Sequence, residues 1–177
     1  FQEACWAYRR LPVPVVAAVH GNCLGGGVQI ALGADFRITA PDARWSVLEA
    51  RWGLVPDISG IRTLTEHVRP DVAKRLTMTG EEVDGTRAVE IGLATQVASD
   101  PGAAAQELVE ALRTRSPDAV AATKRLFTAS PGASARSTLA RERREQSVLL
   151  VSANTAAARR AALDRSGASY GPRQGLS

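Results

Sequence analysis

Cysteine is scarce in this chain, and its scarcity excludes two kinds of site. The 177 residues include two cysteines, Cys5 and Cys23. Two cysteines are too few for a disulfide framework, and their spacing matches no metal-binding motif. We therefore expect no metal site. So little cysteine is typical of a protein from the reducing cytoplasm, which is where we expect this one.

Long apolar runs are also missing. No hydrophobic stretch approaches the roughly 20 residues that a membrane span needs, so we expect no span. The first residues lack the basic start of a signal peptide and include an acid, Glu3. The chain begins with Phe1 instead of Met, in what reads as the middle of a helix. We therefore expect that the natural N-terminus is absent.

The net charge of +4 has no concentrated source. Aromatic residues make up only 5% of the chain, and no block of Lys and Arg reaches five in a row, so we expect no nucleic-acid partner. Acids alternate with bases in residues 141–145, which favours a solvated helix face. A small polyanionic ligand also fits this charge.

The most informative segment that is present covers residues 15–31. A short apolar strand leads to a turn at Gly21, and Gly25–Gly27 then open a helix. Glycines let backbone approach a ligand closely, and the first N–H groups of a helix favour an anion. The spacing fits neither a P-loop nor a dinucleotide fingerprint. A glycine-lined packing turn is the alternative interpretation.

The remaining pattern predicts an α/β region followed by helices alone. We expect a core over residues 1–100, a helical or oligomerisation region over 101–165 and a disordered tail over 166–177. We predict strands over 15–20, 35–40, 45–48 and 93–98, and helices over 1–10, 25–34, 61–67, 70–78, 84–91, 103–114, 117–129 and 135–163.

Several motifs stand in order along the chain: the segments 14–21, 24–28 and 34–38, Glu49 within 46–50, and the segment 53–60. The segments 74–80, 88–93 and 117–124 follow them. In this order they resemble the crotonase superfamily, the enoyl-CoA hydratases and isomerases.

This resemblance implies a fold: a ββα spiral core, of which this chain holds the later part, with a C-terminal all-helical extension. It also implies homotrimers or hexamers and an acyl-CoA thioester substrate, with coenzyme A as part of the substrate and no other cofactor. The Gly26 N–H would bind the thioester oxygen as enolate charge develops, with Gly25 and Leu24 beside it.

Two positions carry acid–base chemistry in the hydratases of this superfamily, where both are glutamates. Here they are Gln29 and Glu49. A glutamine can orient water but cannot exchange a proton at neutral pH. A single glutamate resembles the double-bond isomerases, in which it moves a proton between two carbons. The alternative for Glu49 is a surface carboxylate at a strand end.

Asp57 is the third candidate catalytic residue, eight residues after Glu49. It resembles the aspartate that serves as proton partner in dienoyl-CoA isomerases, although those enzymes also have an aspartate where this chain has Gln29. A turn-forming aspartate is the alternative. The sequence thus favours an isomerase, with two alternatives: a hydratase in which Gln29 and Asp57 position water, and an inactive acyl-CoA-binding subunit.

Overall fold

A computed structural model describes residues 2–174, and its residues group into two compact units. The first unit comprises the residues up to Leu11 together with Val15–Gln106. The second comprises Pro12–Pro14 and the residues from Glu107 onward. Helix α6 (Pro101–Arg113) begins in the first unit and ends in the second, and the expected division at residue 100 stays a prediction.

The first unit holds two small parallel sheets. Strands β1 (Val16–Val19), β3 (Phe36–Thr39) and β5 (Gln96–Val97) form one sheet in the order β1-β3-β5. Strands β2 (Asn22–Leu24) and β4 (Arg44–Ser46) form the other. The sequence did not predict β2 as a strand. Gly21 has a φ of 64° and turns the chain so abruptly that a new strand begins one residue later.

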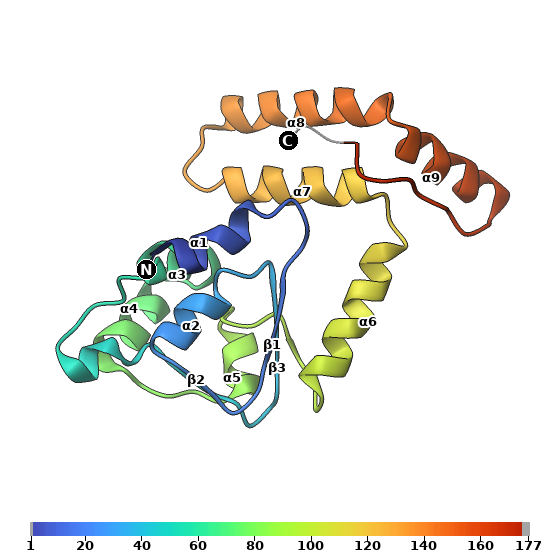
Figure 1. The fold of residues 1–177 in the computed structure, drawn as a ribbon. Coiled ribbons are helices and arrows are strands. Elements are labelled where there is room, and N and C mark those ends of the chain that lie inside the picture. Colours follow the sequence, from blue (N-terminus) through green and yellow to red (C-terminus); the bar gives the residue numbers. More distant parts are fainter. Residues whose placement is uncertain (1, 175–177) are drawn as a thin grey trace. The chain divides into compact units, whose positions relative to one another are not determined.

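Helices connect these strands, as parallel pairing requires (Figure 1). Asp84 accepts a hydrogen bond from Arg87 N at 2.7 Å and so caps α5 (Gly85–Glu90), as its sequence position predicts. Helix α2 (Gly26–Ala31) is shorter than the expected 25–34, since residues 32–34 form turns and a bend. The helices are α1 (Gln2–Arg10), α2 (Gly26–Ala31), the 3-10 helix η1 (Leu48–Trp52), α3 (Gly60–His67), α4 (Pro70–Thr79) and α5 (Gly85–Glu90).

The core of the first unit is built on Trp45, which is fully buried. Its indole N–H donates to Thr39 Oγ1 at 2.9 Å, so its one polar atom is satisfied inside the core. Other buried apolar residues belong to the same core: Val28, Leu32, Val47, Leu64, Leu76 and Leu93. This packing supports both α2 and the start of η1, which carry the candidate site.

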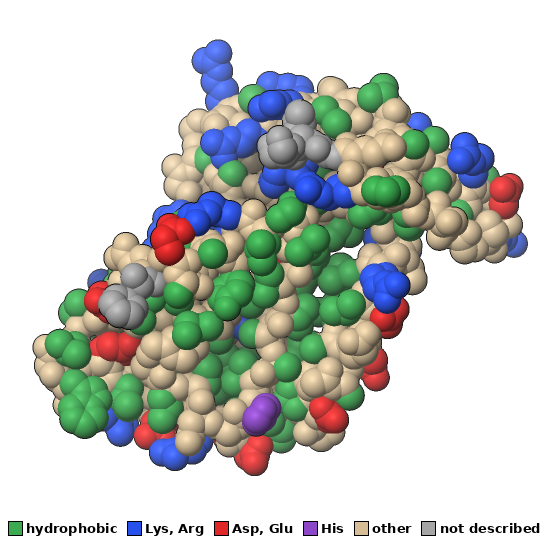
Figure 2. All heavy atoms as spheres, in the orientation of Figure 1, with side chains coloured by type: hydrophobic (Ala, Val, Ile, Leu, Met, Phe, Trp, Pro, Cys, Tyr) green, Lys and Arg blue, Asp and Glu red, His purple; other side chains and the backbone are tan. Residues whose placement is uncertain are grey.

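The second unit is helical. Helices α7 (Pro117–Ala129) and α8 (Ala135–Leu150) form a hairpin that the ion pair Arg125–Glu145 bridges at 2.7 Å (Figure 1). The single helix expected over 135–163 is two helices, because Ser152 ends one and caps α9 (Ala153–Asp164) by accepting from Thr155 N. Figure 2 shows apolar side chains among arginines on the face of this unit that is in view.

The expected disordered tail differs from the structure over residues 166–174. Gly171 N donates to Asn154 Oδ1 at 2.9 Å, and Gln174 N donates to Asp118 Oδ1 at 2.6 Å. Asp118 and Asn154 are both buried, so two side chains of the helices supply the partners that the tail's composition did not suggest. The last three residues of the expected tail lie outside the described ones. None of the helices described over residues 2–174 has the length and apolar character to span a membrane.

Candidate active site

The glycine turn lies between β2 and α2. Gly25 has a φ of 53°, a conformation that favours glycine, and its N–H donates to Ser46 O at 2.8 Å on β4. Gly26 is the first residue of α2, so its N–H has no carbonyl partner within the helix. The geometry therefore distinguishes the two: Gly25 joins the turn to the sheet, whereas Gly26 presents an N–H at a helix start.

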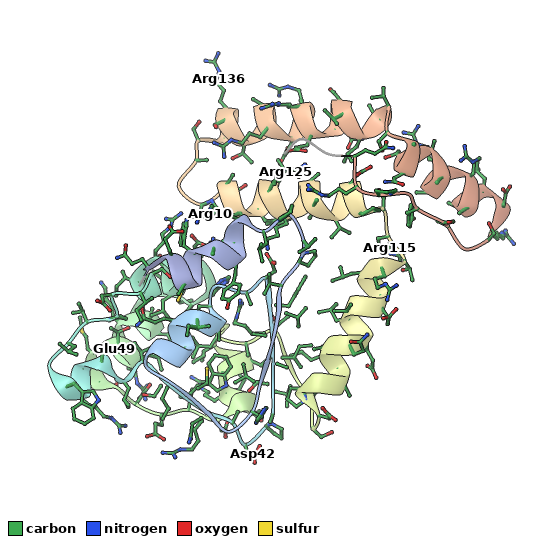
Figure 3. The ribbon with its side chains drawn as sticks, viewed as in Figure 1. Arg10, Asp42, Glu49, Arg115, Arg125 and Arg136 are labelled. Atoms are coloured by element: carbon green, nitrogen blue, oxygen red, sulfur yellow. The ribbon has the colours of Figure 1, made fainter. Side chains whose placement is uncertain are left out.

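Glu49 lies against this turn. A Cβ added to Gly25 would lie 3.6 Å from Glu49 Oε1, and Figure 3 shows Glu49 beside the start of α2. Glu49 comes from the first turn of η1, which follows β4, the strand paired with β2. The parallel pairing of β2 and β4 thus brings the Glu49 carboxylate next to Gly25, although the two residues are far apart in the sequence.

Gln29 and Glu49 contact each other directly. Gln29 Nε2 donates to Glu49 Oε1 at 2.6 Å. Gln29 is only 1% exposed, so this bond forms inside the protein, where an unpaired polar group would be costly. The two positions that the resemblance singled out are therefore one hydrogen-bonded pair.

The amide oxygen of Gln29 is held from the other side. Gln29 Oε1 accepts from Ile58 N at 2.8 Å and from Gly60 N at 2.9 Å. Two N–H donors assign this atom as the carbonyl oxygen, so the amide N–H₂ faces Glu49. Sequence reasoning missed Ile58 and Gly60 as site residues. Gly60 does stand in the matching segment 53–60, but its role depends on a contact 31 residues away in sequence.

The second carboxylate oxygen of Glu49 has no such partner. Among the described residues, Glu49 Oε2 is buried and accepts no hydrogen bond. Glu49 thus has one oxygen bound to the Gln29 amide and one oxygen with unused lone pairs. An oxygen of this kind can take up a proton from a bound molecule.

The model of the enoyl-CoA hydratase/isomerase family matches residues 1–165. The chain belongs to this family. The expected resemblance to the crotonase superfamily is confirmed, and the α/β architecture agrees with it.

Individual members of the enoyl-CoA hydratase/isomerase family agree in sequence and fold. Carnitinyl-CoA dehydratase of Citrobacter koseri is 36% identical over 121 residues, which are 67% of this chain and 46% of that protein. An enoyl-CoA hydratase structure from Polaromonas has a TM-score of 0.91 at 29% identity, covering 96% of this chain and 67% of that one. One from Mycobacterium tuberculosis has a TM-score of 0.86 at 32% identity, covering 90% and 64%. The chain spans about half the length of the curated relatives it matches.

Asp57 and Leu24, which were also predicted as site residues, lie outside the hydrogen-bonded pair of Gln29 and Glu49. Asp57 is exposed, and its recorded bond is made by its backbone oxygen, which accepts from Gln2 Nε2 at 3.0 Å. Its carboxylate reaches neither Gln29 nor Glu49 by any hydrogen bond among the described residues. Leu24 is half-buried at the end of β2, one residue before the turn.

Cys23 and the two tryptophans that flank Glu49 in the sequence differ in how deeply they are buried. Cys23 is buried, and burial raises the pKa of its thiol to about 12, so it packs as an apolar residue. Trp45 belongs to the core, whereas Trp52 is 75% exposed at the end of η1. Figure 2 shows apolar side chains over η1 and the loop after it, where Leu54 and Val55 are also exposed.

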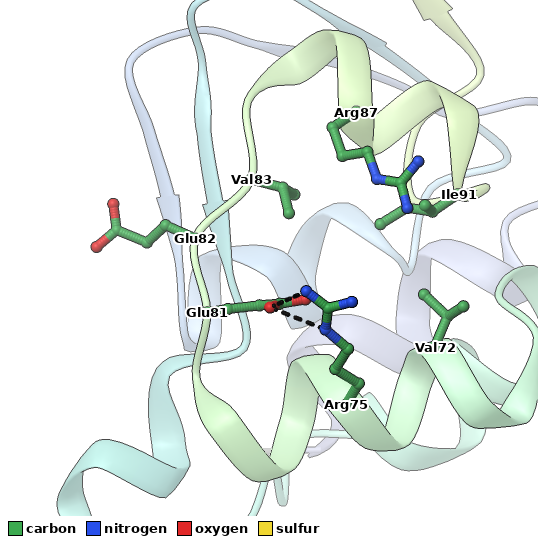
Figure 4. Close-up of a pocket in the computed structure, with 7 residues that line it drawn as sticks. All are labelled: Val72, Arg75, Glu81, Glu82, Val83, Arg87 and Ile91. Carbon is green, nitrogen blue, oxygen red and sulfur yellow. Dashed lines mark hydrogen bonds and ion pairs between the residues drawn. The ribbon is translucent and has the colours of Figure 1, made fainter.

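A separate pocket of about 160 Å³ lies between α4 and α5 (Figure 4). Arg75 and Glu81 form an ion pair of 2.9 Å in its wall. Its lining contains none of the candidate site residues: it consists of Val72, Arg75, Glu81, Glu82, Val83, Arg87 and Ile91.

Within residues 2–174, no group of three His, Cys, Asp or Glu side chains is placed to hold a metal ion.

Proposed function

We propose that the protein carrying this chain is an acyl-CoA enzyme that isomerises the double bond of an enoyl- or dienoyl-CoA. The observation that supports this most strongly is the Gln29–Glu49 pair, which contains one carboxylate and one amide. Coenzyme A enters as part of the substrate, and the reaction needs no further cofactor.

Isomerisation requires a base that takes a proton from one carbon and returns it to another. Glu49 Oε2 takes the proton from the carbon that lies between the double bond and the thioester, and the electron pair moves to the thioester oxygen. The Gly26 N–H stabilises that enolate oxygen. The electron pair then returns, the double bond moves into conjugation, and Glu49 delivers the same proton to the far carbon. One carboxylate is sufficient, and the reaction consumes no water.

Hydration is the second candidate. The family includes proteins named enoyl-CoA hydratase and carnitinyl-CoA dehydratase, which favours water chemistry. Addition of water needs one group to take a proton from water and another to supply a proton to carbon. Gln29 cannot do the second task, so Glu49 would do both while Gln29 and Asp57 orient the water. An inactive acyl-CoA-binding subunit is the third candidate.

The experiment is Glu49→Gln in the protein that carries this chain, assayed with a 3-enoyl-CoA. Formation of the conjugated 2-enoyl thioester is followed by its absorbance. We expect a loss of about 10²–10⁴-fold in kcat, the usual effect of removing a general base. Glu90→Gln is the control, because Glu90 is an exposed carboxylate paired with Arg87 at 2.8 Å. An unchanged kcat in Glu49→Gln would exclude this mechanism.

A second substrate separates the candidates. Crotonyl-CoA loses its conjugated absorbance when it is hydrated, so rapid loss would favour the hydratase. Tight binding of both thioesters, with no turnover of either and no uptake of deuterium from deuterated water, would favour the inactive subunit.

We also propose a homotrimer or hexamer, without a nucleic-acid partner, in the cytoplasm. Support for the assembly comes from the second unit, where Phe127, Val151 and Leu163 are each at least 76% exposed. A contiguous apolar patch is typical of a surface that another molecule covers, and we propose these three side chains as parts of one.

A further inference from the structure

Gly60 lies where a side chain would collide with the Gln29 amide. A Cβ added to Gly60 would lie 2.6 Å from Gln29 Oε1 and 2.9 Å from Gln29 Cδ. It would also lie 2.8 Å from Pro56 Cβ. Separations of this size are below van der Waals contact, so the amide or the loop would have to move.

The backbone around Gly60 is shaped to bind one oxygen. Ser59 has a φ of 75°, an unusual value for a residue other than glycine. This left-handed residue turns the chain so that the N–H groups on both sides of it, at Ile58 and Gly60, meet at Gln29 Oε1. Such a concave arrangement of N–H groups is a nest, which binds an oxygen with partial or full negative charge.

The nest determines which way the Gln29 amide faces. In the observed orientation the amide makes three hydrogen bonds, one as a donor and two as an acceptor. Rotating the amide by 180° would place its N–H₂ against two N–H donors and its oxygen against the Glu49 carboxylate. Three attractive contacts would become three repulsive ones, so the nest permits one orientation.

We propose that Gly60 is a positioning residue of the catalytic site: its N–H and its missing side chain hold the Gln29 amide so that this amide binds Glu49 Oε1 and leaves Oε2 for the substrate. The inference rests on the proposed function of Glu49 as the base. It adds a residue that touches neither substrate nor reacting atoms and acts through Gln29.

The test is a double-mutant cycle on Gly60→Ala and Gln29→Ala in the isomerase assay. We expect Gly60→Ala to lower kcat at least 10-fold and to change KM less than 2-fold, because the added methyl group displaces the amide without filling the substrate site. In the Gln29→Ala background, the same substitution should cost less than 2-fold. Gly167→Ala is the matched control, since a Cβ there would meet no atom within 4 Å.

Each other outcome overturns the inference. Equal losses from Gly60→Ala with and without Gln29 would mean that Gly60 acts only on the loop, through Pro56. A wild-type kcat in Gln29→Ala would mean that the amide does not position Glu49. If Gly60→Ala alone does not fold, the double variant decides. Folding restored by removal of the Gln29 amide supports the collision with that amide, whereas a double variant that also fails to fold means that the contact with Pro56 dominates, which overturns the inference.

These outcomes are distinct from a failure of the proposed function. If Glu49→Gln retains full isomerase activity, then Glu49 is not the base and the function is wrong. If Glu49→Gln is inactive while Gly60→Ala and Gln29→Ala both resemble the wild type, the function stands and only the positioning role is wrong.

Discussion

His67 is a half-buried histidine outside the candidate site, at the end of α3. Burial, followed by the nearby charges of Arg37 and Arg9, lowers the pKa of His67 from 6.5 to about 4. The neutral ring is therefore the folded form at neutral pH. Among the described residues its Nε2 is buried without a hydrogen-bond partner, which also disfavours a second proton on the ring.

This lowered pKa predicts how the stability of the fold depends on pH. Between pH 6.5 and about 4, the unfolded chain binds a proton at His67 and the folded chain does not, so the free energy of unfolding falls as pH falls. The slope from one proton is at most about 1.36 kcal/mol per pH unit. We expect His67→Gln to reduce the fall between pH 7 and 5, measured from urea unfolding. His20→Gln, at an exposed histidine, should leave it unchanged; equal curves for all three proteins would contradict the prediction.

At the level of single residues, the sequence could identify Gln29 and Glu49 because each stands at a recognisable distance from a motif. Their hydrogen bond follows from the pairing of β2 with β4, and β2 was not predicted. Gly60 could not be identified in this way. Its importance comes from the space that the Gln29 side chain occupies, and a one-dimensional pattern contains no record of such a contact.

At the scale of elements, the strongest local signals predicted the structure well. Pro70 and Pro117 each begin a helix, and Asp84 and Ser116 cap helices through their side chains. The helix expected over 135–163 failed for a different reason. The helical pattern of apolar and charged residues continues through Val151 and Ser152. The N-cap at Ser152 could therefore be predicted only by giving the serine more weight than this pattern.

The cap at Ser152 gives a prediction for the α8–α9 corner. Ser152 Oγ accepts from Thr155 N at 3.1 Å and contacts Thr155 Oγ1 at 3.0 Å. We expect Ser152→Ala to lower the free energy of unfolding by about 1 kcal/mol, the usual cost of losing an N-cap. Urea unfolding followed by circular dichroism measures it.

Ser147→Ala is the matched control for this cap. Ser147 is exposed in the interior of α8, where its hydroxyl donates to Arg143 O. Alanine is the better helix former at such a position, so this change should leave stability equal or slightly higher. If both serine variants lose the same stability, Ser152 does not act as a cap.

At the scale of the whole molecule, the two units differ in how they bury apolar surface. The first unit has a central core around Trp45, and its sheets and helices enclose it. In α8, by contrast, no residue is buried, and only Asn154 and Ala161 are buried in α9. Helices with so little burial derive little stability from their own unit. This contrast supports the proposal that other copies of the chain cover them.

Val151 offers the most direct test of that assembly, because it is 86% exposed at the corner between α8 and α9. We expect the protein carrying this chain to have a mass of three or six protomers by light scattering coupled to size exclusion. Val151→Asp would place a charge in an apolar interface, so it should shift the population toward smaller species while the circular dichroism of the fold stays unchanged. Val151→Ile keeps the position apolar and should retain the assembly. A wild-type mass for Val151→Asp would show that this corner is not part of an interface, and a monomeric wild type would exclude the trimer and hexamer altogether.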